Sequence, residues 1–290
     1  MIKAMNSPVR KLGLVLKRHD PRVRDVVTSI IPWLQSRGVE VFLDQETASQ
    51  YPLSGSVTGA NELAECVDVV AVFGGDGTFL YAARLAGGRG VPLIGINLGS
   101  LGFLAEVKLD EMHAAFECLV SGNYQFEERV LMDVKVLRQD NQLAQYLALN
   151  DVVINKGALA RMIELEVWVN SEQVTITRAD GLIIATPTGS TAYSMSAGGP
   201  IVYPTLGAFI ITPICPHTLS NRPLVVPDGA AVGVCLRHGG DVMLTVDGQV
   251  GMPLMQGDCI RLQKAASSLR LIQATGSTFF KLLREKLKWN

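Results

Sequence analysis

We predict two domains of different fold class from this sequence: an α/β domain with a parallel sheet over residues 1–125, and a β-rich, sandwich-like domain over residues 126–275. A length of 290 residues is typical of about two domains. Apolar strand-like runs alternate with helical segments as far as Tyr124, which is typical of βαβ units. Beyond Tyr124, short strand-like runs separated by Gly, Pro, Asn and Asp dominate, which favours an antiparallel sandwich.

The elements expected in the first domain follow from hydrophobic periodicity. Runs rich in Val, Ile and Leu predict strands over 12–16, 39–43, 68–73 and 91–96. Apolar residues at helical spacing predict helices over 23–34, 78–85 and 109–120. Pro32 lies inside the first of these helices, and we expect a kink there because proline lacks the N–H that a helix interior needs.

The second domain is expected to consist almost entirely of short strands. They are predicted over 130–137, 147–154, 163–169, 174–177, 182–185, 209–214, 224–226, 231–236, 242–246 and 259–263. The tail from Phe279 to Trp289 returns to helical spacing with one apolar side, and a helix of this kind is expected to dock on a core.

Composition argues against several classes of protein. The formal net charge of -1 gives no sign of a nucleic-acid partner or an anionic membrane surface. No apolar run reaches the roughly 18–20 residues of a membrane span, and no secretory signal is recognisable. The five cysteines never form C-x-x-C, and the four histidines lack metal-ligand spacing. We therefore expect no metal site and no disulfide framework, but free buried thiols in a reducing cytoplasm.

The segment Gly-Gly-Asp-Gly-Thr at 74–78 is the most informative motif. It follows the apolar run 69–73 and precedes a helical pattern, so it lies at the carboxyl end of a predicted parallel strand, where such sheets bind ligands. The glycines leave backbone N–H groups open to a phosphate, and Asp76 adds a carboxylate. The segment matches neither G-x-G-x-x-G nor a P-loop, and turns of this kind can also bind nothing.

Three further segments place polar residues at strand ends. Asn97–Leu104 is a second Gly-rich segment, either a ligand loop or a plain connection. Asn150 and Asp151 interrupt an apolar strand; they can grip a ribose or an adenine amino group, or form a bulge or exposed turn. Arg178–Pro200 contains Thr-Pro-Thr-Gly-Ser-Thr, which suits an anion or a sugar, or merely caps a helix. Ser194 lacks G-x-S-x-G and a neighbouring His, which disfavours a hydrolase.

In their order and spacing, these motifs resemble those of NAD kinases, the bacterial cytoplasmic type in particular. Gly-Gly-Asp-Gly-Thr alone also occurs in diacylglycerol and sphingosine kinases. The later Thr186–Tyr193, Thr-Pro-Thr-Gly-Ser-Thr-Ala-Tyr, is specific, and Asp247-Gly248-Gln249 resembles a late signature of the family. The resemblance covers nearly the whole chain. It implies an N-terminal α/β domain, a C-terminal β-sandwich domain and a last helix, within 276–290, that returns to the N-terminal domain.

The resemblance implies ATP-dependent phosphorylation of the adenosine 2′-hydroxyl of NAD to give NADP, with a divalent cation such as Mg²⁺. It also implies a cytoplasmic homodimer or homotetramer, with some sites shared between subunits, and no nucleic-acid or membrane partner. Two alternatives are a diacylglycerol-type lipid kinase and a catalytically idle NAD-binding regulator. The long Thr-Pro motif argues against the first, and the intact Asp76 argues against the second.

Matched residue by residue, the resemblance makes Asp76 the catalytic residue, a carboxylate that accepts the proton of the ribose hydroxyl during phosphoryl transfer. Mg²⁺ and backbone N–H groups would neutralise charge, and no side chain is assigned as a metal ligand. A basic residue at Arg178 accompanies preference for NAD over NADH in the family, and pairing with Asp180 would give that preference a physical basis. The predicted binding residues for NAD and ATP are Gly74, Gly75, Gly77, Thr78, Asn150, Asp151, Arg161, Arg178, Asp180, Thr191, Ala192, Tyr193, Ser194, Met195, Ser196 and Gln249.

Overall fold

The computed structural model describes residues 7–51, 53–60, 62–99, 101–218, 220–273 and 278–289. The chain divides into two compact units: unit 1 comprises Met1–Glu128 and Leu269–Asn290, and unit 2 comprises Arg129–Ser268. Strands β7 (Phe126–Arg138) and β18 (Cys259–Ile272) each continue from one unit into the other.

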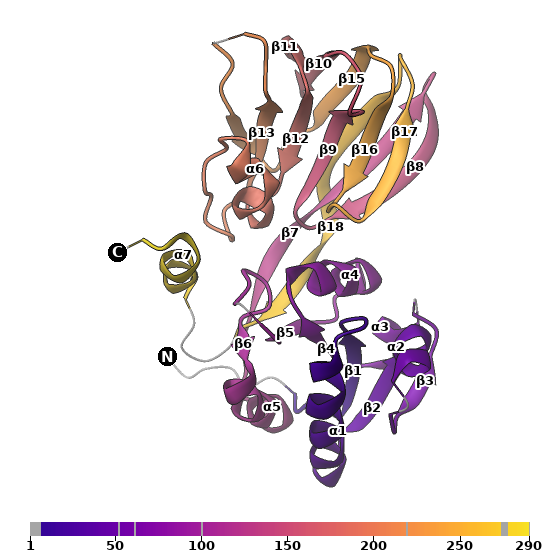
Figure 1. Ribbon diagram of the computed structural model, residues 1–290, viewed down its shortest axis with the longest axis vertical. Helices are drawn as coiled ribbons and strands as arrows, with labels where there is room; N and C mark the ends of the chain where they lie inside the picture. Colours follow the sequence, from indigo (N-terminus) through magenta and orange to yellow (C-terminus); the bar gives the residue numbers. More distant parts are fainter. Residues whose placement is uncertain are drawn as a thin grey trace. The chain divides into compact units, whose positions relative to one another are not determined.

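Unit 1 is built on a parallel sheet in the order β3-β2-β1-β4-β5 (Figure 1). Strands β1 and β4 run through the middle and are almost completely buried, as expected for parallel strands covered on both faces. The predicted α/β class with a parallel sheet is therefore confirmed. The strands are β1 (Lys11–Leu16), β2 (Glu40–Asp44), β3 (Ser56–Thr58), β4 (Val69–Gly74), β5 (Leu93–Asn97) and β6 (Val107–Lys108), which pairs with β5.

Helices cover both faces of this sheet. On one face, Ile30 of α1 and Phe116 of α5 share a core with Leu14 and Ala71 of the central strands. On the other face, Leu63 of α3 packs beside β1 at 3.2 Å from where a Cβ of Gly13 would stand. No helix among the described residues is both long and apolar enough to cross a membrane. The helices are α1 (Pro21–Ser36), α2 (Gln45–Gln50), α3 (Leu63–Cys66), α4 (Asp76–Ala86), η1 (Leu109–Glu111), α5 (Met112–Ser121) and α7 (Phe279–Leu287).

Unit 2 is a sandwich of two sheets (Figure 1). One has the order β11-β10-β15-β18, with β7 beside β18 and β8 beside β7, and the other has the order β14-β13-β12-β9-β16-β17. Alternate apolar residues of both sheets, such as Leu165, Val234, Ile154 and Leu244, form one buried core. The predicted β-sandwich is confirmed. The remaining elements are β8 (Asn141–Ala148), β9 (Asp151–Lys156), β10 (Ile163–Val169), β11 (Glu172–Ala179), β12 (Gly181–Ala185), η2 (Thr188–Thr191), α6 (Tyr193–Ser196), β13 (Ala208–Ile214), β14 (Leu224–Pro227), β15 (Val232–His238), β16 (Val242–Val246) and β17 (Val250–Leu254).

Helix α1 continues through Pro32, which is exposed, and the kink expected there stays a prediction. Two features of the fold differ from the expectations. The strand expected over 147–154 is two strands, because the chain bends at Leu149 and Asn150. Strand β18 extends to Ile272, well past the expected end at 263, because its far end joins the sheet of unit 1 beside β5.

The expectation that all cysteines are free is wrong for one pair. Cys235 of β15 and Cys259 of β18 stand opposite each other in register and form a disulfide across a sequence separation of 24 residues. Strand pairing brings these thiols together, and neither the number nor the spacing of the cysteines reveals it. Cys66 and Cys118 are half-buried free thiols, and Cys215 is an exposed one.

Candidate functional site

Asp76 is the first residue of α4, and only Gly75 separates it from Gly74, the last residue of β4. Its side chain turns towards the segment that follows β5. Oδ2 accepts a hydrogen bond from the backbone N–H of Phe103 (3.0 Å), and Oδ1 accepts from those of Leu104 (3.0 Å) and Ala105 (3.2 Å). A carboxylate offers about four lone-pair sites. One site on Oδ2 therefore stays available to a further donor, while Oδ1 is fully used.

The glycines around Asp76 serve two different purposes. An added Cβ would lie 2.0 Å from Asp76 Oδ1 at Gly102, and 2.4 Å from Thr78 Oγ1 at Gly74, so these two glycines make room for neighbouring side chains. At Gly75 and Gly77, no atom of the described residues lies within 4 Å of such a Cβ. The space next to the backbone that the motif predicts is therefore present at Gly75 and Gly77, and a phosphate ligand there stays a prediction. Ser100, in the second Gly-rich segment, lies outside the described residues.

In unit 2, polar residues gather at the adjoining ends of three neighbouring strands. Asp151 begins β9 opposite Ala185, the last residue of β12, and β16 ends beside them at Val246. The backbone N–H of Thr186 donates to the carbonyl of Asn150 (2.9 Å). Asn150 and Asp151 therefore form one cluster with the start of the Thr-Pro-Thr-Gly-Ser-Thr segment.

Asp247 closes this cluster. Its Oδ2 accepts from the backbone N–H of Leu149 (2.9 Å), and its Oδ1 accepts from those of Asn150 (2.7 Å) and Asp151 (3.0 Å). Its own N–H donates to the carbonyl of Asp151 (2.9 Å). Sequence reasoning noted Asp247 only as part of a signature, and no role was predicted for it. Its position after an apolar strand and before a glycine is typical of a turn. The backbone N–H groups that donate to its side chain belong to a segment about 100 residues earlier, which the local pattern does not indicate.

Asp151 is a buried acid beside a second carboxylate. The residue is 5% exposed. Burial, together with the negative charge of Asp247, raises the pKa of Asp151 to about 7. The alternative of an exposed turn at Asn150 and Asp151 is therefore excluded for Asp151.

Two buried polar atoms of this cluster have no hydrogen-bond partner within the described residues: Asn150 Oδ1 and Thr188 Oγ1. A buried polar group without a partner costs about 1–3 kcal/mol. Backbone packing fixes the segment that carries Thr188, because an added Cβ at Gly189 would lie 2.0 Å from the carbonyl oxygen of Asn150. The cluster is thus closely packed, while two of its buried acceptors have no partner among the described residues.

The predicted binding residues 191–196 comprise the last residue of η2, Ala192 and the whole of α6. Tyr193 is exposed, whereas Ser194 is fully buried. The Ser194 hydroxyl lies 3.0 Å from the Thr212 hydroxyl, in a hydrogen bond that ties α6 to β13. Thr191 donates its hydroxyl to the carbonyl of Thr188 (3.3 Å). The side chains of Ser194 and Thr191 therefore already have partners within the protein. Ala192, Met195 and Ser196 complete the segment and are half-buried or exposed.

The pairing expected between Arg178 and Asp180 is wrong. Arg178 Nε donates to Glu164 Oε2 across β11 and β10 (2.9 Å), whereas Asp180 Oδ1 lies 3.7 Å from Lys156 Nζ. The two residues flank the buried Ala179, and each finds a partner on a different strand.

Two further predicted binding residues of unit 2 lie in loops. Arg161 is exposed in the loop between β9 and β10. Gln249 is exposed in the turn between β16 and β17, where its backbone N–H donates to the carbonyl of Val246 (3.0 Å). The turn holds Gln249 next to Asp247, so it belongs to the same end of the sandwich as Asn150.

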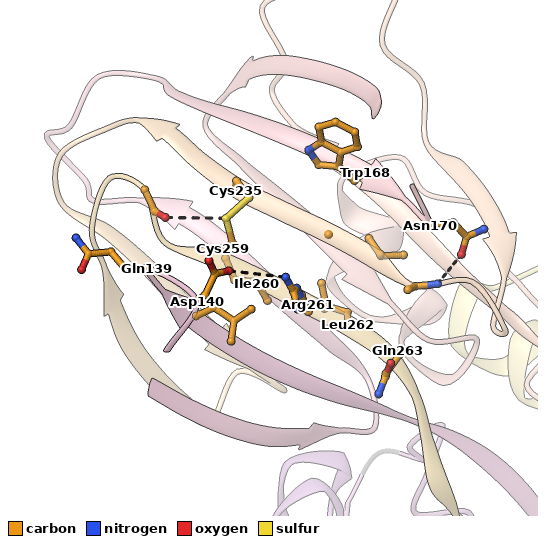
Figure 2. A pocket seen from close by; sticks show the side chains of 15 residues that line it. Gln139, Asp140, Trp168, Asn170, Cys235, Cys259, Ile260, Arg261, Leu262 and Gln263 are labelled. Carbon is orange, nitrogen blue, oxygen red and sulfur yellow. Dashed lines mark hydrogen bonds and ion pairs between the residues drawn. A yellow bond between two sulfur atoms is a disulfide. The ribbon is translucent and has the colours of Figure 1, made fainter. Parts of the chain in front are cut away.

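A cavity of about 580 Å³ also lies in unit 2, on the outer face of the sheet formed by β10, β15 and β18 (Figure 2). Trp168, Gly233 and Arg261 stand in one cross-strand row, with the side-chain-free Gly233 between the other two. The disulfide of Cys235 and Cys259 lies in the next row. No predicted binding residue lines this cavity, so the candidate site remains at the strand ends.

The comparisons with known proteins agree with the motifs. The family models that match are the ATP-NAD kinase N-terminal domain over residues 12–124 and the ATP-NAD kinase C-terminal domain over residues 149–274. The NAD kinase of Geobacter sulfurreducens is 46% identical over 282 residues, which is 97% of this chain and 99% of that protein. The NAD kinase of Solibacter usitatus is 44% identical over 284 residues, 97% of this chain and 98% of that protein.

Two solved structures are similar to this fold. A yeast NADH kinase complexed with NADH matches with a TM-score of 0.89 and 28% identity, over 98% of this chain and 89% of that one. An NAD kinase from Archaeoglobus fulgidus in complex with ATP matches with a TM-score of 0.76 and 27% identity, over 96% of this chain and 98% of that one.

Proposed function

This chain belongs to the NAD kinase family, and on that premise we propose how its residues transfer a phosphoryl group from ATP to NAD. The observation that carries the activity is the match of both family domains in order, together with 46% identity over 97% of the chain. The comparisons support neither a lipid kinase nor an idle regulator.

An assay with ATP, Mg²⁺ and NAD tests the activity directly, with NADP measured through an NADP-specific dehydrogenase. We expect NADP to form only when ATP is present, and no phosphorylation when diacylglycerol replaces NAD. NAD binding without NADP formation would instead identify an idle regulator.

We propose that Asp76 accepts the proton of the adenosine 2′-hydroxyl as the phosphoryl group is transferred. A ribose hydroxyl is a poor nucleophile at neutral pH, so a positioned carboxylate assists the transfer, as in protein kinases. The remaining lone-pair site of Oδ2 is the one that suits this proton, since Oδ1 already accepts from Leu104 and Ala105. These backbone donors hold the carboxylate in one orientation before any substrate binds.

The donor phosphates are proposed to lie against Gly75 and Gly77 at the start of α4, where no described atom lies within 4 Å of an added Cβ, so a ligand can come close to the backbone. When bound, Mg²⁺ neutralises charge on the phosphate oxygens. Among the described residues, no three His, Cys, Asp or Glu side chains gather into a metal site. Since Mg²⁺ is commonly held by substrate phosphates, water and one or two carboxylates, we infer that it enters with ATP.

The adenosine part of NAD is proposed to bind at the strand ends of unit 2. Asn150 Oδ1 and Thr188 Oγ1 are buried there without partners, and they can accept from a ribose hydroxyl or an adenine amino group. Asp151 adds a carboxyl group that can donate or accept near neutral pH, since its pKa is about 7. The predicted contacts from Arg161, Arg178, Asp180, Gln249 and residues 191–196 remain part of this proposal.

We also propose that the enzyme acts in the cytoplasm as a homodimer or homotetramer, as its resemblance to bacterial NAD kinases implies. Light scattering coupled to size-exclusion chromatography measures the mass of the assembly. A monomeric mass at the concentration used in the assay would contradict the proposed oligomer.

A further inference from the structure

A group of three charged residues, Lys17, Asp20 and Arg22, lies at the carboxyl edge of the sheet in unit 1, beside the turn of Gly75 and Asp76. In register, Leu16 of β1 pairs with Phe73 of β4, and Gly74 of β4 pairs with Asn97 of β5. Because β4 lies between β1 and β5 (Figure 1), the loops that follow the outer two strands flank the glycine turn on both sides.

Arg22 connects these two flanking loops. It lies in the first turn of α1, after β1, and its Nη1 donates to the carbonyl of Leu98, the residue after β5 (2.6 Å). A side chain that joins these two points must cross the end of β4. The guanidinium group therefore lies over the strand end that carries the open Gly75.

Asp20 holds Arg22 in this position. Asp20 is 6% exposed, and its Oδ1 and Oδ2 accept from Arg22 Nε (2.9 Å) and Nη2 (2.7 Å). The Arg22 hydrogen bonds hold the pKa of Asp20 well below its usual range, although burial opposes this shift. Lys17 Nζ adds a second cation 3.2 Å from Oδ2. Tyr51 fixes the loop by donating its hydroxyl to the carbonyl of Lys17 (2.9 Å).

The charge of this group is not balanced internally. Two cations, Lys17 and Arg22, share one carboxylate, so the group carries one excess positive charge. A guanidinium has five N–H donors, and three of those of Arg22 point to Asp20 and Leu98. Its side chain is 54% exposed. Within the described part of the chain, two donors of Arg22 therefore remain for a ligand at the glycine turn, with a geometry that suits phosphate oxygens.

We propose that Arg22, oriented by Asp20, binds the phosphates of the phosphoryl donor over the glycine turn. It supplies the fixed positive charge that a P-loop lysine supplies in other kinases. This inference rests on the proposed function, because the donor is taken to be ATP.

Steady-state kinetics of Arg22→Gln tests the proposal. We expect the KM for ATP to rise about 10- to 100-fold, as for the loss of a charged hydrogen bond, while the KM for NAD changes less than about threefold. Arg22→Lys keeps the charge and should recover part of the ATP affinity. Asp20→Asn leaves Arg22 in place without its bidentate partner and should raise the KM for ATP by a smaller factor.

Arg24→Gln is the matched control, since Arg24 is exposed on the same helix and has no ion pair in the described part of the chain. Calorimetry with ATP, ADP and AMP in the absence of NAD supplies a readout that needs no turnover. Arg22→Gln should weaken ATP and ADP binding and leave AMP binding nearly unchanged.

Equal losses for AMP and ATP, or equal rises of both KM values, would show that Arg22 only joins two loops and would overturn the proposal. An inactive wild type would refute the proposed function, while the nucleotide series would still test Arg22.

Discussion

Unit 1 and unit 2 each use an aspartate side chain to collect three backbone N–H groups, but with different consequences. Asp76 gathers those of residues 103–105 and stands at a helix start next to open glycines. Asp247 gathers those of residues 149–151 and stands beside a second, buried carboxyl group, that of Asp151. The same hydrogen-bond pattern thus orients a carboxylate at a helix start in one unit and ties three strand ends together in the other. We propose catalysis for the first aspartate and support of the NAD-binding residues for the second.

The largest expected effect is that of Asp76→Asn. We expect turnover to fall by roughly 10²–10⁴-fold, the usual share of general acid–base catalysis, with NAD affinity changed much less. The amide also loses backbone hydrogen bonds, because its NH₂ group cannot accept from an N–H. Kinetics at saturating ATP and NAD measures this loss.

Asp247→Asn is the matched control for Asp76→Asn, since it loses the same kind of backbone hydrogen bonds in the other unit. It should chiefly raise the KM for NAD and leave turnover at saturating NAD within about tenfold. A similar fall in turnover for both variants would contradict the different roles proposed for Asp76 and Asp247. Near-normal turnover of Asp76→Asn would exclude Asp76 as the general base.

Asn150→Ala should weaken NAD binding by about 1–3 kcal/mol, the cost of one lost hydrogen bond to a polar ligand group. The expectation follows from the buried Asn150 Oδ1, which lacks a partner among the described residues. Isothermal titration with NAD measures the affinity, and circular dichroism checks the fold. Unchanged affinity in a folded variant would leave Asn150 with a purely structural role.

Because of Asp151, we expect the free energy of unfolding to fall as the pH rises from about 4 to about 7. In this window the unfolded chain has released the proton, since an ordinary aspartate titrates near 4. The folded chain still holds it, because the pKa of Asp151 is about 7. The unfolded state therefore binds fewer protons, and raising the pH favours unfolding. Urea unfolding at pH 5 and pH 8 measures the change.

In Asp151→Asn, the Asp151 part of this pH dependence should disappear. Asp140→Asn, at a residue of the same unit whose side chain is 96% exposed, serves as the control. An Asp151→Asn variant with the same pH dependence as the wild type would show that Asp151 is ionised in the fold.

The smallest change in kinetics is expected for substitution of Arg178, whose guanidinium pairs with the side chain of Glu164 and not with the backbone. We predict that Arg178→Gly narrows the ratio of kcat/KM for NAD to that for NADH, by less than about fivefold, because an exposed ion pair contributes little. Glu164→Gln frees the same arginine and tests whether its charge matters. An unchanged ratio in both variants would remove Arg178 from the account of specificity.

Local patterns were enough to predict the parallel sheet of unit 1, the β-sandwich of unit 2 and the two Gly-rich segments. Continuous runs of apolar residues locate β1, β4 and β5, and the Gly-Gly-Asp-Gly-Thr motif locates the turn at Asp76. Short elements such as α2, α3 and β3 were missed, because four to six residues, or fewer, carry too little periodicity. The disulfide of Cys235 and Cys259 was missed for a different reason, since it depends on which strands pair.

The sequence by itself determined the family, the two fold classes and the residue types of the site, because these are written in local periodicity and in contiguous motifs. Only the tertiary structure decided which partners these residues have. Asp76 meets backbone groups 27–29 residues away, Asp247 meets a turn 96–98 residues away, and Arg22 reaches a carbonyl 76 residues away. Each of these hydrogen bonds joins a side chain to a backbone N–H or C=O group, and nearly every residue type carries such groups. No side-chain pattern therefore predicts the backbone partner, which comes within reach only when the strand order brings distant loops to one edge of the sheet.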